Sequence, residues 1–197
     1  MTDKTTPKFD LNKHTFKLLQ SEPFFAGLSR RIHKKESTAI PTAGVKLNKE
    51  TAQFEMLYNP EFFAKLPDEQ KQGVLMHEFY HIIYGHVTDR LPEGGMNKLW
   101  NIATDLAINS YLRGKLPEGC CMPTVGHFED YPLGKASEWY YEKLKQDQQN
   151  GEGAFKNKGE PQDGDGNGQG QGGGQPQDGD GQPSQGGGGL PDTLDDH

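Results

Sequence analysis

The residues Val74-Leu75-Met76-His77-Glu78-Phe79-Tyr80-His81 contain the pattern H-E-x-x-H within an apolar run. Two histidines four positions apart project from the same side of an α-helix. Upstream, Pro67 is followed by Asp68 and Glu69, a composition typical of the first turn of a helix. The stretch therefore predicts a helix that starts near Pro67 and carries both imidazoles on one face.

The other face of this predicted helix is apolar. At roughly 100° per residue, Leu75, Phe79 and Ile82 share a narrow arc opposite the two histidines. This distribution predicts a helix that packs on a core by one face and lines a cleft with the other. Two imidazoles one turn apart can hold the same Zn²⁺, and the adjacent Glu78 can then act on a metal-activated water. The alternative is an ordinary core helix that contains histidines.

A catalytic zinc site usually has three protein ligands, and three residues compete for the third position. His86 is nearest in sequence, but on a continuous helix it points away from His77 and His81, so it would require a break near Gly85. It is better explained as a buried histidine beside the site. His127 lies in an irregular stretch that gives its side chain no defined direction.

Asp105 is the third candidate and the one that the pattern favours. It lies in a second amphipathic segment, residues 99–109, where Asn101, Asp105 and Asn109 recur at four-residue spacing beside an apolar stripe. A carboxylate in the middle of such a helix is costly to bury without a partner, and flanking amides could orient that carboxylate as a metal ligand. A solvated polar face is the alternative.

Five segments together are similar in order and spacing to a family described as a putative metallopeptidase domain, found in bacteria and phages, often upstream of a von Willebrand factor A-like domain. The matching segments are residues 22–28, 41–45, 57–63, 75–86 and 99–109. The resemblance implies a zincin-like fold, with His77 and His81 as metal ligands, Glu78 as general base and the helix of Asp105 completing the site. It also implies a peptide or protein substrate, and a separate von Willebrand factor A-like protein as a partner.

These observations predict an α+β, mostly helical zincin-like domain that uses Zn²⁺ to hydrolyse peptide bonds. A different class of function stays open, in which the domain is a non-catalytic, zinc-stabilised module or adaptor that binds a protein partner. A structural zinc site has no need of a glutamate beside its first ligand, so Glu78 favours the enzyme.

Composition divides the chain near residue 150. The last 47 residues hold 16 of the 26 glycines, with 9 acidic and 2 basic side chains, whereas the first 150 residues are electrically neutral. This predicts a metallopeptidase domain over residues 1–149 and a disordered, acidic Gly/Gln/Asp-rich tail over 150–197. The folded part shows no basic excess that would indicate nucleic acid. No signal segment or membrane-spanning run is present, and the adjacent Cys120 and Cys121 indicate reduced thiols, so a cytoplasmic location is expected.

The remaining elements are expected from local patterns. Residues 10–35 predict two helices separated at Ser21–Pro23, with Ser21 capping the second, and residues 43–58 predict a β-hairpin that turns at 48–51. Residues 60–65 predict a short helix, and a last helix is expected from Ser137, as its cap, to about Gln148. Tyr111 and Tyr131 are open candidates for a phenol that faces the reacting carbonyl.

Overall fold

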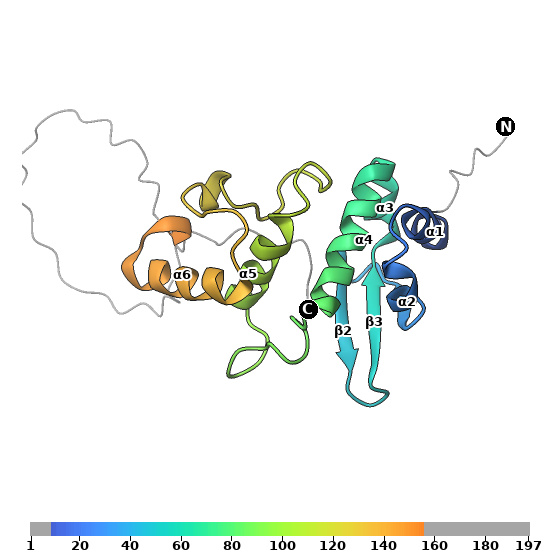
Figure 1. Ribbon diagram of the computed structural model, residues 1–197, viewed down its shortest axis with the longest axis horizontal. Helices are drawn as coiled ribbons and strands as arrows, with labels where there is room; N and C mark the ends of the chain where they lie inside the picture. Colours follow the sequence, from blue (N-terminus) through green and yellow to red (C-terminus); the bar gives the residue numbers. More distant parts are fainter. Residues whose placement is uncertain (1–8, 156–197) are drawn as a thin grey trace, which may run out of the picture.

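The computed structural model describes residues 9–155 and shows a mixed α+β architecture with one small sheet (Figure 1). In chain order the elements are α1 (Leu11–Ser21), α2 (Phe25–Ser29), β1 (Ile32–Glu36), β2 (Ala43–Asn48), β3 (Gln53–Tyr58), α3 (Pro60–Lys65), α4 (Asp68–Ile83), α5 (Lys98–Asn109), the 3₁₀ turn η1 (Gly126–Phe128), α6 (Ser137–Asn150) and the 3₁₀ turn η2 (Gly153–Phe155). The helix predicted around His77 is α4, and the helix predicted around Asp105 is α5. Most of the predicted tail, residues 156–197, lies outside the described residues.

The predicted hairpin is confirmed and forms two strands of a three-stranded sheet with the order β1-β3-β2. Strands β2 and β3 pair antiparallel, with Val45 opposite Met56. The side chain of Asn48 accepts the backbone N–H groups of Glu50 and Thr51 at 3.0 and 3.1 Å, which closes the turn. Strand β2 is therefore both one arm of the hairpin and one edge of the sheet.

The prediction of a helix through Ile32 is wrong. Helix α2 ends at Ser29, and Ile32–Glu36 is strand β1, which pairs parallel to β3 with Ile32 opposite Phe54. Only Ile32 of this strand is buried, so its apolar pattern is too short to indicate a strand by itself. Pairing with β3, about twenty residues further along the chain, decides its conformation. Ser21 is likewise the last residue of α1 and does not cap α2.

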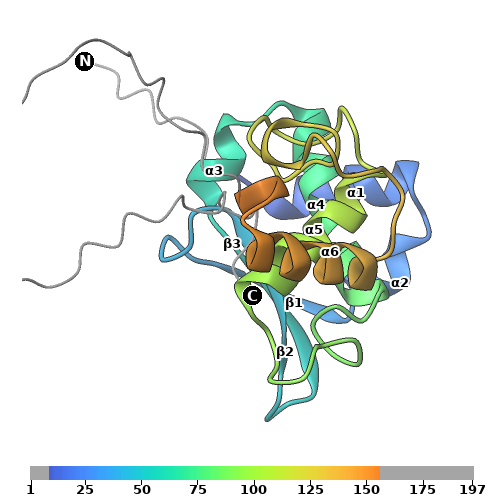
Figure 2. The same ribbon diagram turned by 90° about the vertical axis from the view of Figure 1, so that its left-hand side faces the viewer.

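The buried side chains form two hydrophobic cores. Helix α5 lies between α4 and α6 (Figures 1 and 2) and contributes to both cores. The first core joins α1 to α4 with the sheet, through buried residues that include Leu18, Phe25, Val45, Met56, Phe63, Leu75 and Phe79. The second lies between α5, α6 and the loop before α6, through Ile102, Leu106, Phe128, Tyr131, Tyr140 and Leu144. Helix α5 also contributes Ile108 to the first core. The polar side of α5 consequently lies at the boundary between the two cores.

Gly73 marks a close approach between α4 and the chain that follows α5. A Cβ atom at this position would lie 1.9 Å from the backbone oxygen of Lys115, which is not compatible with any unstrained contact. The missing side chain therefore lets the middle of α4 pack directly on backbone. This contact helps set the position of α4, the helix that carries His77 and His81.

Gly73→Ala is expected to lower the free energy of unfolding by about 1–3 kcal/mol, because the clash with Lys115 outweighs the gain in helix propensity. Gly27→Ala is the matched control, since Gly27 is also helical and a Cβ there meets nothing within 4 Å. The control is expected to leave stability equal or raise it by about 0.4–1 kcal/mol. Urea unfolding of both variants measures the difference; equal stability would contradict the close approach.

Two further expectations concern the chain as a whole. Among the helices of residues 9–155, none combines the length and the apolar character that a bilayer crossing requires. Within the same residues Cys120 and Cys121 form no disulfide bond, and Cys121 is buried.

Candidate metal centre

Helix α4 ends in a way that separates His86 from the two histidines before it. The backbone N–H of Gly85 donates to the oxygen of Ile82 at 3.1 Å, and that of His86 donates to the oxygen of His81 at 2.9 Å. Gly85 has a φ of +68°. These two hydrogen bonds around a left-handed glycine form a Schellman motif, which closes the helix just after Ile83. His81 thus occupies the last turn of α4, and His86 follows the helix end.

Helix α5 brings a carboxylate to the same place. The side chain of Asn97 accepts the backbone N–H of Trp100 at 3.0 Å and caps the start of this helix. Every residue of α5 from Trp100 to Asn109 is buried, and Asp105 is 0% exposed. The solvated polar face considered for Asp105 is therefore wrong, because Asn101, Asp105 and Asn109 are all buried.

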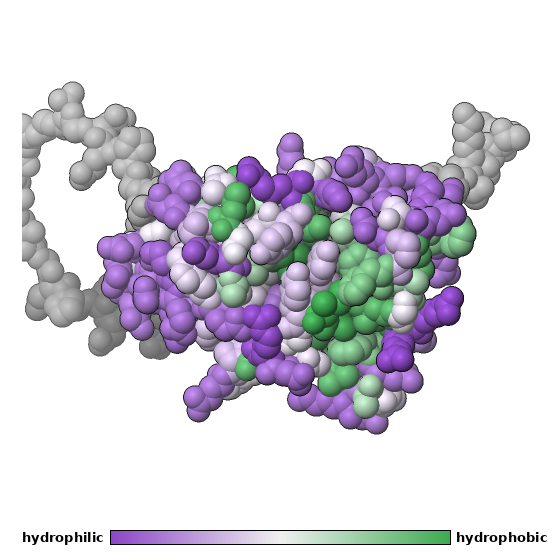
Figure 3. Space-filling model, in the orientation of Figure 1, coloured by the Kyte–Doolittle hydropathy of each residue, from purple (hydrophilic) through white to green (hydrophobic). Residues whose placement is uncertain are grey.

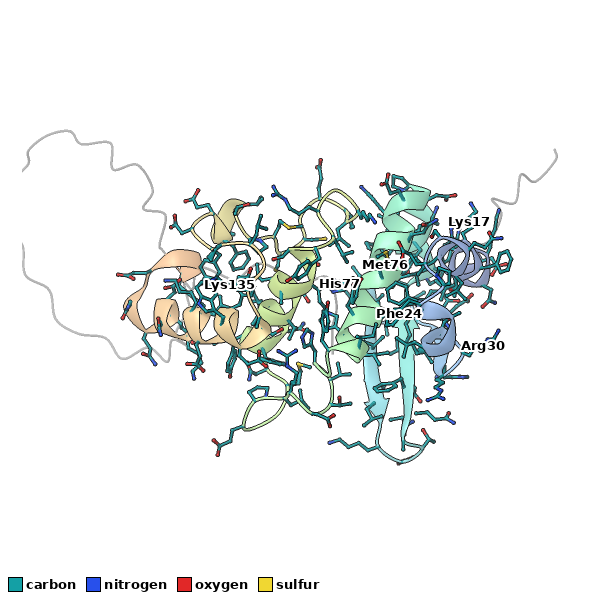
Figure 4. The ribbon with its side chains drawn as sticks, in the orientation of Figure 1. Lys17, Phe24, Arg30, Met76, His77 and Lys135 are labelled. Carbon is teal, nitrogen blue, oxygen red and sulfur yellow. The ribbon has the colours of Figure 1, made fainter. Side chains whose placement is uncertain are left out.

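Three side chains from α4 and α5 converge on one point. The Nε2 atoms of His77 and His81 are 3.0 Å apart. Asp105 Oδ1 lies 3.5 Å from Nε2 of His77 and 3.4 Å from Nε2 of His81. All three side chains are completely buried. Figure 4 shows His77 on the side of α4 that faces α5, whereas Met76 and Phe24 lie on the side of α1 and α2.

The triangle formed by these atoms fits a metal ion. Donor atoms about 2.0–2.1 Å from a tetrahedral Zn²⁺ lie roughly 3.3 Å from one another, close to the three observed separations. Two imidazole nitrogens and one carboxylate oxygen form a common donor set for a catalytic zinc ion. His77, His81 and Asp105 are the group of side chains that the described residues bring together in this way. Their role as ligands stays a prediction.

A chain of hydrogen bonds extends from His77 away from this triangle. Its Nδ1 atom lies 2.8 Å from Oδ1 of Asn109, the last residue of α5. The Nδ2 atom of Asn109 donates to the backbone oxygen of Cys121 at 2.8 Å. All of these groups are buried. The Asn109 amide, which was expected to orient Asp105, therefore contacts His77 of α4.

The two competing third ligands lie elsewhere. The ring of His86 is 5.2 Å from that of His81, but its Nε2 atom is 2.8 Å from Oγ of Ser137 at the start of α6. His86 is buried beside the triad and is not part of it. His127 is exposed in η1. The Schellman motif at Gly85 explains why a histidine so close in sequence is directed to another helix.

Ser137 does not cap α6, contrary to the prediction. The residue before the helix is Ala136, and no side chain caps the first turn. The hydroxyl of Ser137 is used instead in the contact with His86, and Arg90 forms an ion pair with the neighbouring Glu138 through Nε at 2.8 Å. Two polar contacts therefore attach the start of α6 to the segment that follows α4.

Glu78 follows His77 on α4 and is also 0% exposed. A carboxylate that is removed from water is stabilised by a nearby cation or by hydrogen-bond donors. A bound divalent ion at the triad would supply such a positive charge one residue away. Glu78 is thus a buried carboxylate that directly follows His77 on the same helix.

A pocket of about 300 Å³ has His86 in its wall. Its walls come from the residues just after α4, the C-terminal end of α5 and the start of α6, and they include Tyr84, His86, Arg90, Tyr111, Lys135 and Ser137. Burial, reinforced by Tyr80 and Tyr111, raises the pKa of the Tyr84 phenol, so Tyr84 stays a hydrogen-bond donor at neutral pH. Tyr111 is 66% exposed. The hydroxyl of Tyr131 instead donates to Asp147 at 2.8 Å within the second core, and Tyr131 is only 1% exposed.

Comparison with known proteins agrees with this geometry. Residues 7–194 match a family model described as "Putative metallopeptidase domain". An uncharacterized protein of Thermotoga maritima is 39% identical over 57 residues, which make up 29% of this chain and 14% of the length of that relative. No solved structure matches the chain. Since the family model spans nearly the whole sequence, the chain belongs to the putative metallopeptidase domain family.

Proposed function

We propose that the protein is a zinc-dependent metallopeptidase with a zincin-like fold, in which His77, His81 and Asp105 hold the ion and Glu78 is the general base. The observation that carries this proposal is the convergence of three donor atoms within 3.0–3.5 Å, with a buried glutamate next to His77 in sequence. Membership of the family supports hydrolysis of peptide bonds. The two imidazoles favour Zn²⁺ over Mg²⁺ or Ca²⁺, which prefer oxygen ligands.

Each residue has a defined part in this reaction. When bound, the ion would lower the pKa of a water molecule toward 7 and polarise the carbonyl of the substrate. The carboxylate of Glu78 accepts the proton of that water and returns it to the leaving amine. His77 and His81, fixed on successive turns of α4, and Asp105 on α5 hold their donor atoms in place, so that little reorganisation is needed during the reaction.

The surface around the site suits an extended peptide. Strand β2 is an edge of the sheet and packs against α4, and an edge strand can pair with an added strand of substrate. Figure 3 shows apolar surface over α2 and the C-terminal half of α4, where Phe24 is 73% and Ile83 is 36% exposed. We propose unfolded segments with apolar side chains as substrates, and a separate von Willebrand factor A-like protein as a partner.

Complete burial of the triad favours a second candidate function, a metal-stabilised module that binds a protein partner. Because the donor atoms of His77, His81 and Asp105 are 0% exposed, a peptide carbonyl can reach them only if neighbouring side chains move. The pocket described above has His86 in its wall, and the ring of His86 lies 5.2 Å from that of His81. A module that never opens would keep the ion and hydrolyse nothing.

Metal analysis and a cleavage assay distinguish the two functions. The purified chain is expected to bind one Zn²⁺, and it is expected to cleave unfolded casein in a reaction that 1,10-phenanthroline stops and added Zn²⁺ restores. One bound ion without any cleavage would support the binding module. A chain that binds no divalent ion would contradict both candidates.

A further inference from the structure

Asn109 makes two buried side-chain hydrogen bonds, one of them with His77. Its side-chain amide lies between the ring of His77, at 2.8 Å, and the backbone oxygen of Cys121, also at 2.8 Å. Asn109 is 0% exposed and follows Asp105 by one turn of α5. The amide thus connects three parts of the chain: α4, α5 and the loop between α5 and α6.

The contact with Cys121 determines which way the amide faces. A backbone carbonyl oxygen can only accept a hydrogen bond, so the group directed at it must be the NH₂ of Asn109. The amide oxygen then faces His77, and an oxygen can only accept there. It follows that Nδ1 of His77 carries the proton in this contact.

The position of that proton decides how His77 can act. A neutral imidazole carries one proton, so with Nδ1 protonated the lone pair lies on Nε2. Nε2 is the atom that lies 3.0 Å from Nε2 of His81 and 3.5 Å from Oδ1 of Asp105. The opposite tautomer would place a hydrogen in the middle of the three donor atoms and would exclude a cation from them.

We infer that Asn109 is a positioning residue that selects the metal-binding tautomer of His77 and fixes the plane of its ring, with the Cys121 carbonyl as its anchor. This inference rests on the metal site of the proposed function. Asn109 does not touch the ion or the substrate. It acts through His77, and the loop at Cys121 is thereby part of the structure that supports the site.

The two hydrogen bonds can be separated by substitution. Asn109→Leu has nearly the same size and removes both. Asn109→Asp keeps an acceptor for His77 and removes the donor to Cys121, so it is expected to retain the tautomer while losing stability. Ser110→Ala is the matched control, because the Ser110 hydroxyl contacts Leu106 and Tyr140 on the side of α6 and has no contact with His77.

The direct test is the tautomer of His77 in the metal-free, full-length chain, measured by ¹⁵N NMR of the imidazole. The chain has seven histidines, and the signal is assigned by its loss in His77→Gln. The wild type and Ser110→Ala are expected to show a protonated Nδ1, and Asn109→Leu a shift toward the other tautomer. A wild-type His77 protonated on Nε2 would overturn the inference, even if Asn109→Leu fails to fold.

Metal affinity is the second readout, measured by competition with a chromophoric chelator for Zn²⁺. Asn109→Leu is expected to bind roughly 10–100-fold more weakly, the range found when a group that orients a ligand is removed. Asn109→Asp should stay close to the wild type. A purely structural brace would instead give a lower Tm in Asn109→Leu with unchanged affinity and tautomer, which would contradict the inference.

Failure of the proposed function gives a different result from failure of this inference. A wild type that binds Zn²⁺ without hydrolysing peptide bonds removes the peptidase, but it leaves both the tautomer and the affinity series valid. If His77 of the wild type is protonated on Nδ1 but the protein binds no ion, there is no metal site. Asn109 then has no role in metal binding. Hydrolysis by an Asn109→Leu variant of unchanged affinity would overturn the positioning role alone.

Discussion

Exchange of Glu78 for glutamine is expected to leave Zn²⁺ bound and to lower kcat/KM for a peptide substrate by about 10²–10⁴-fold, the usual contribution of a general base. Glutamine has the shape of glutamate and fits the same buried position, but it cannot accept the proton of water at neutral pH. The side chain is 0% exposed, so solvent does not replace it as a base. Steady-state cleavage of a fluorogenic peptide, with metal content measured on the same sample, checks the result.

Glu69→Gln is the matched control for this experiment. Glu69 lies in the first turn of the same helix and is exposed, so its substitution makes the same chemical change away from the triad. The control is expected to keep full activity. Unchanged activity in Glu78→Gln would remove Glu78 from the reaction, and loss of the ion would show that the glutamate supports metal binding instead.

Replacement of Asp105 by alanine is expected to weaken Zn²⁺ binding by at least about 10–100-fold, since even loss of a group that only orients a ligand has an effect of this size. It should also remove most of the stabilisation that the ion provides. The triad joins α4, which belongs to the first core, to α5, which contributes most to the second. A bound ion therefore connects the two cores at their boundary.

The stability effect follows from the preference of the ion for the folded chain. At a free Zn²⁺ concentration 1,000 times the Kd, binding contributes about 4 kcal/mol to the free energy of unfolding. For a domain of this size, a chelator is then expected to lower the Tm of the wild type by roughly 8–16 °C. Differential scanning calorimetry with and without Zn²⁺ measures the change, and in Asp105→Ala the two Tm values should nearly coincide.

Asp89→Ala supplies the control, because Asp89 is exposed in the loop between α4 and α5 and is outside the triad. Its response to Zn²⁺ and to the chelator should match that of the wild type. If the affinity for Zn²⁺ is unchanged in Asp105→Ala, another residue is the third ligand. His86, whose ring lies 5.2 Å from that of His81, is then the next candidate.

Local sequence patterns were sufficient where a residue and its determinants lie within one helix or one turn. The spacing of His77 and His81 predicts two imidazoles on one side of a helix, and α4 places them there. The hairpin and the short helix at Pro60–Lys65 were predicted for the same reason, because Asn48 and Asn59 cap or close them through contacts two or three residues away. The four-residue spacing of Asn101, Asp105 and Asn109 on α5 predicted Asp105 as the third ligand, and that role stays a prediction.

Patterns failed where a distant part of the chain decides the outcome. Ile32–Glu36 becomes a strand because β3 pairs with it, and a five-residue segment with one buried side chain carries no periodic signal of its own. Ser137 stands where a helix cap is expected, but its hydroxyl forms a hydrogen bond with the buried Nε2 of His86. The histidines of α4 were expected to line a cleft, whereas α5 covers them completely.

The amino-acid sequence by itself determined which helix carries the imidazoles and the glutamate, because side-chain direction on a helix depends only on spacing along the chain. The tertiary structure alone decided that Asp105 meets those imidazoles, that His86 turns away to α6, and that Asn109 connects His77 to the carbonyl of Cys121. These contacts join residues that lie between 12 and 51 positions apart. Such contacts depend on how the two cores pack, which no local pattern encodes.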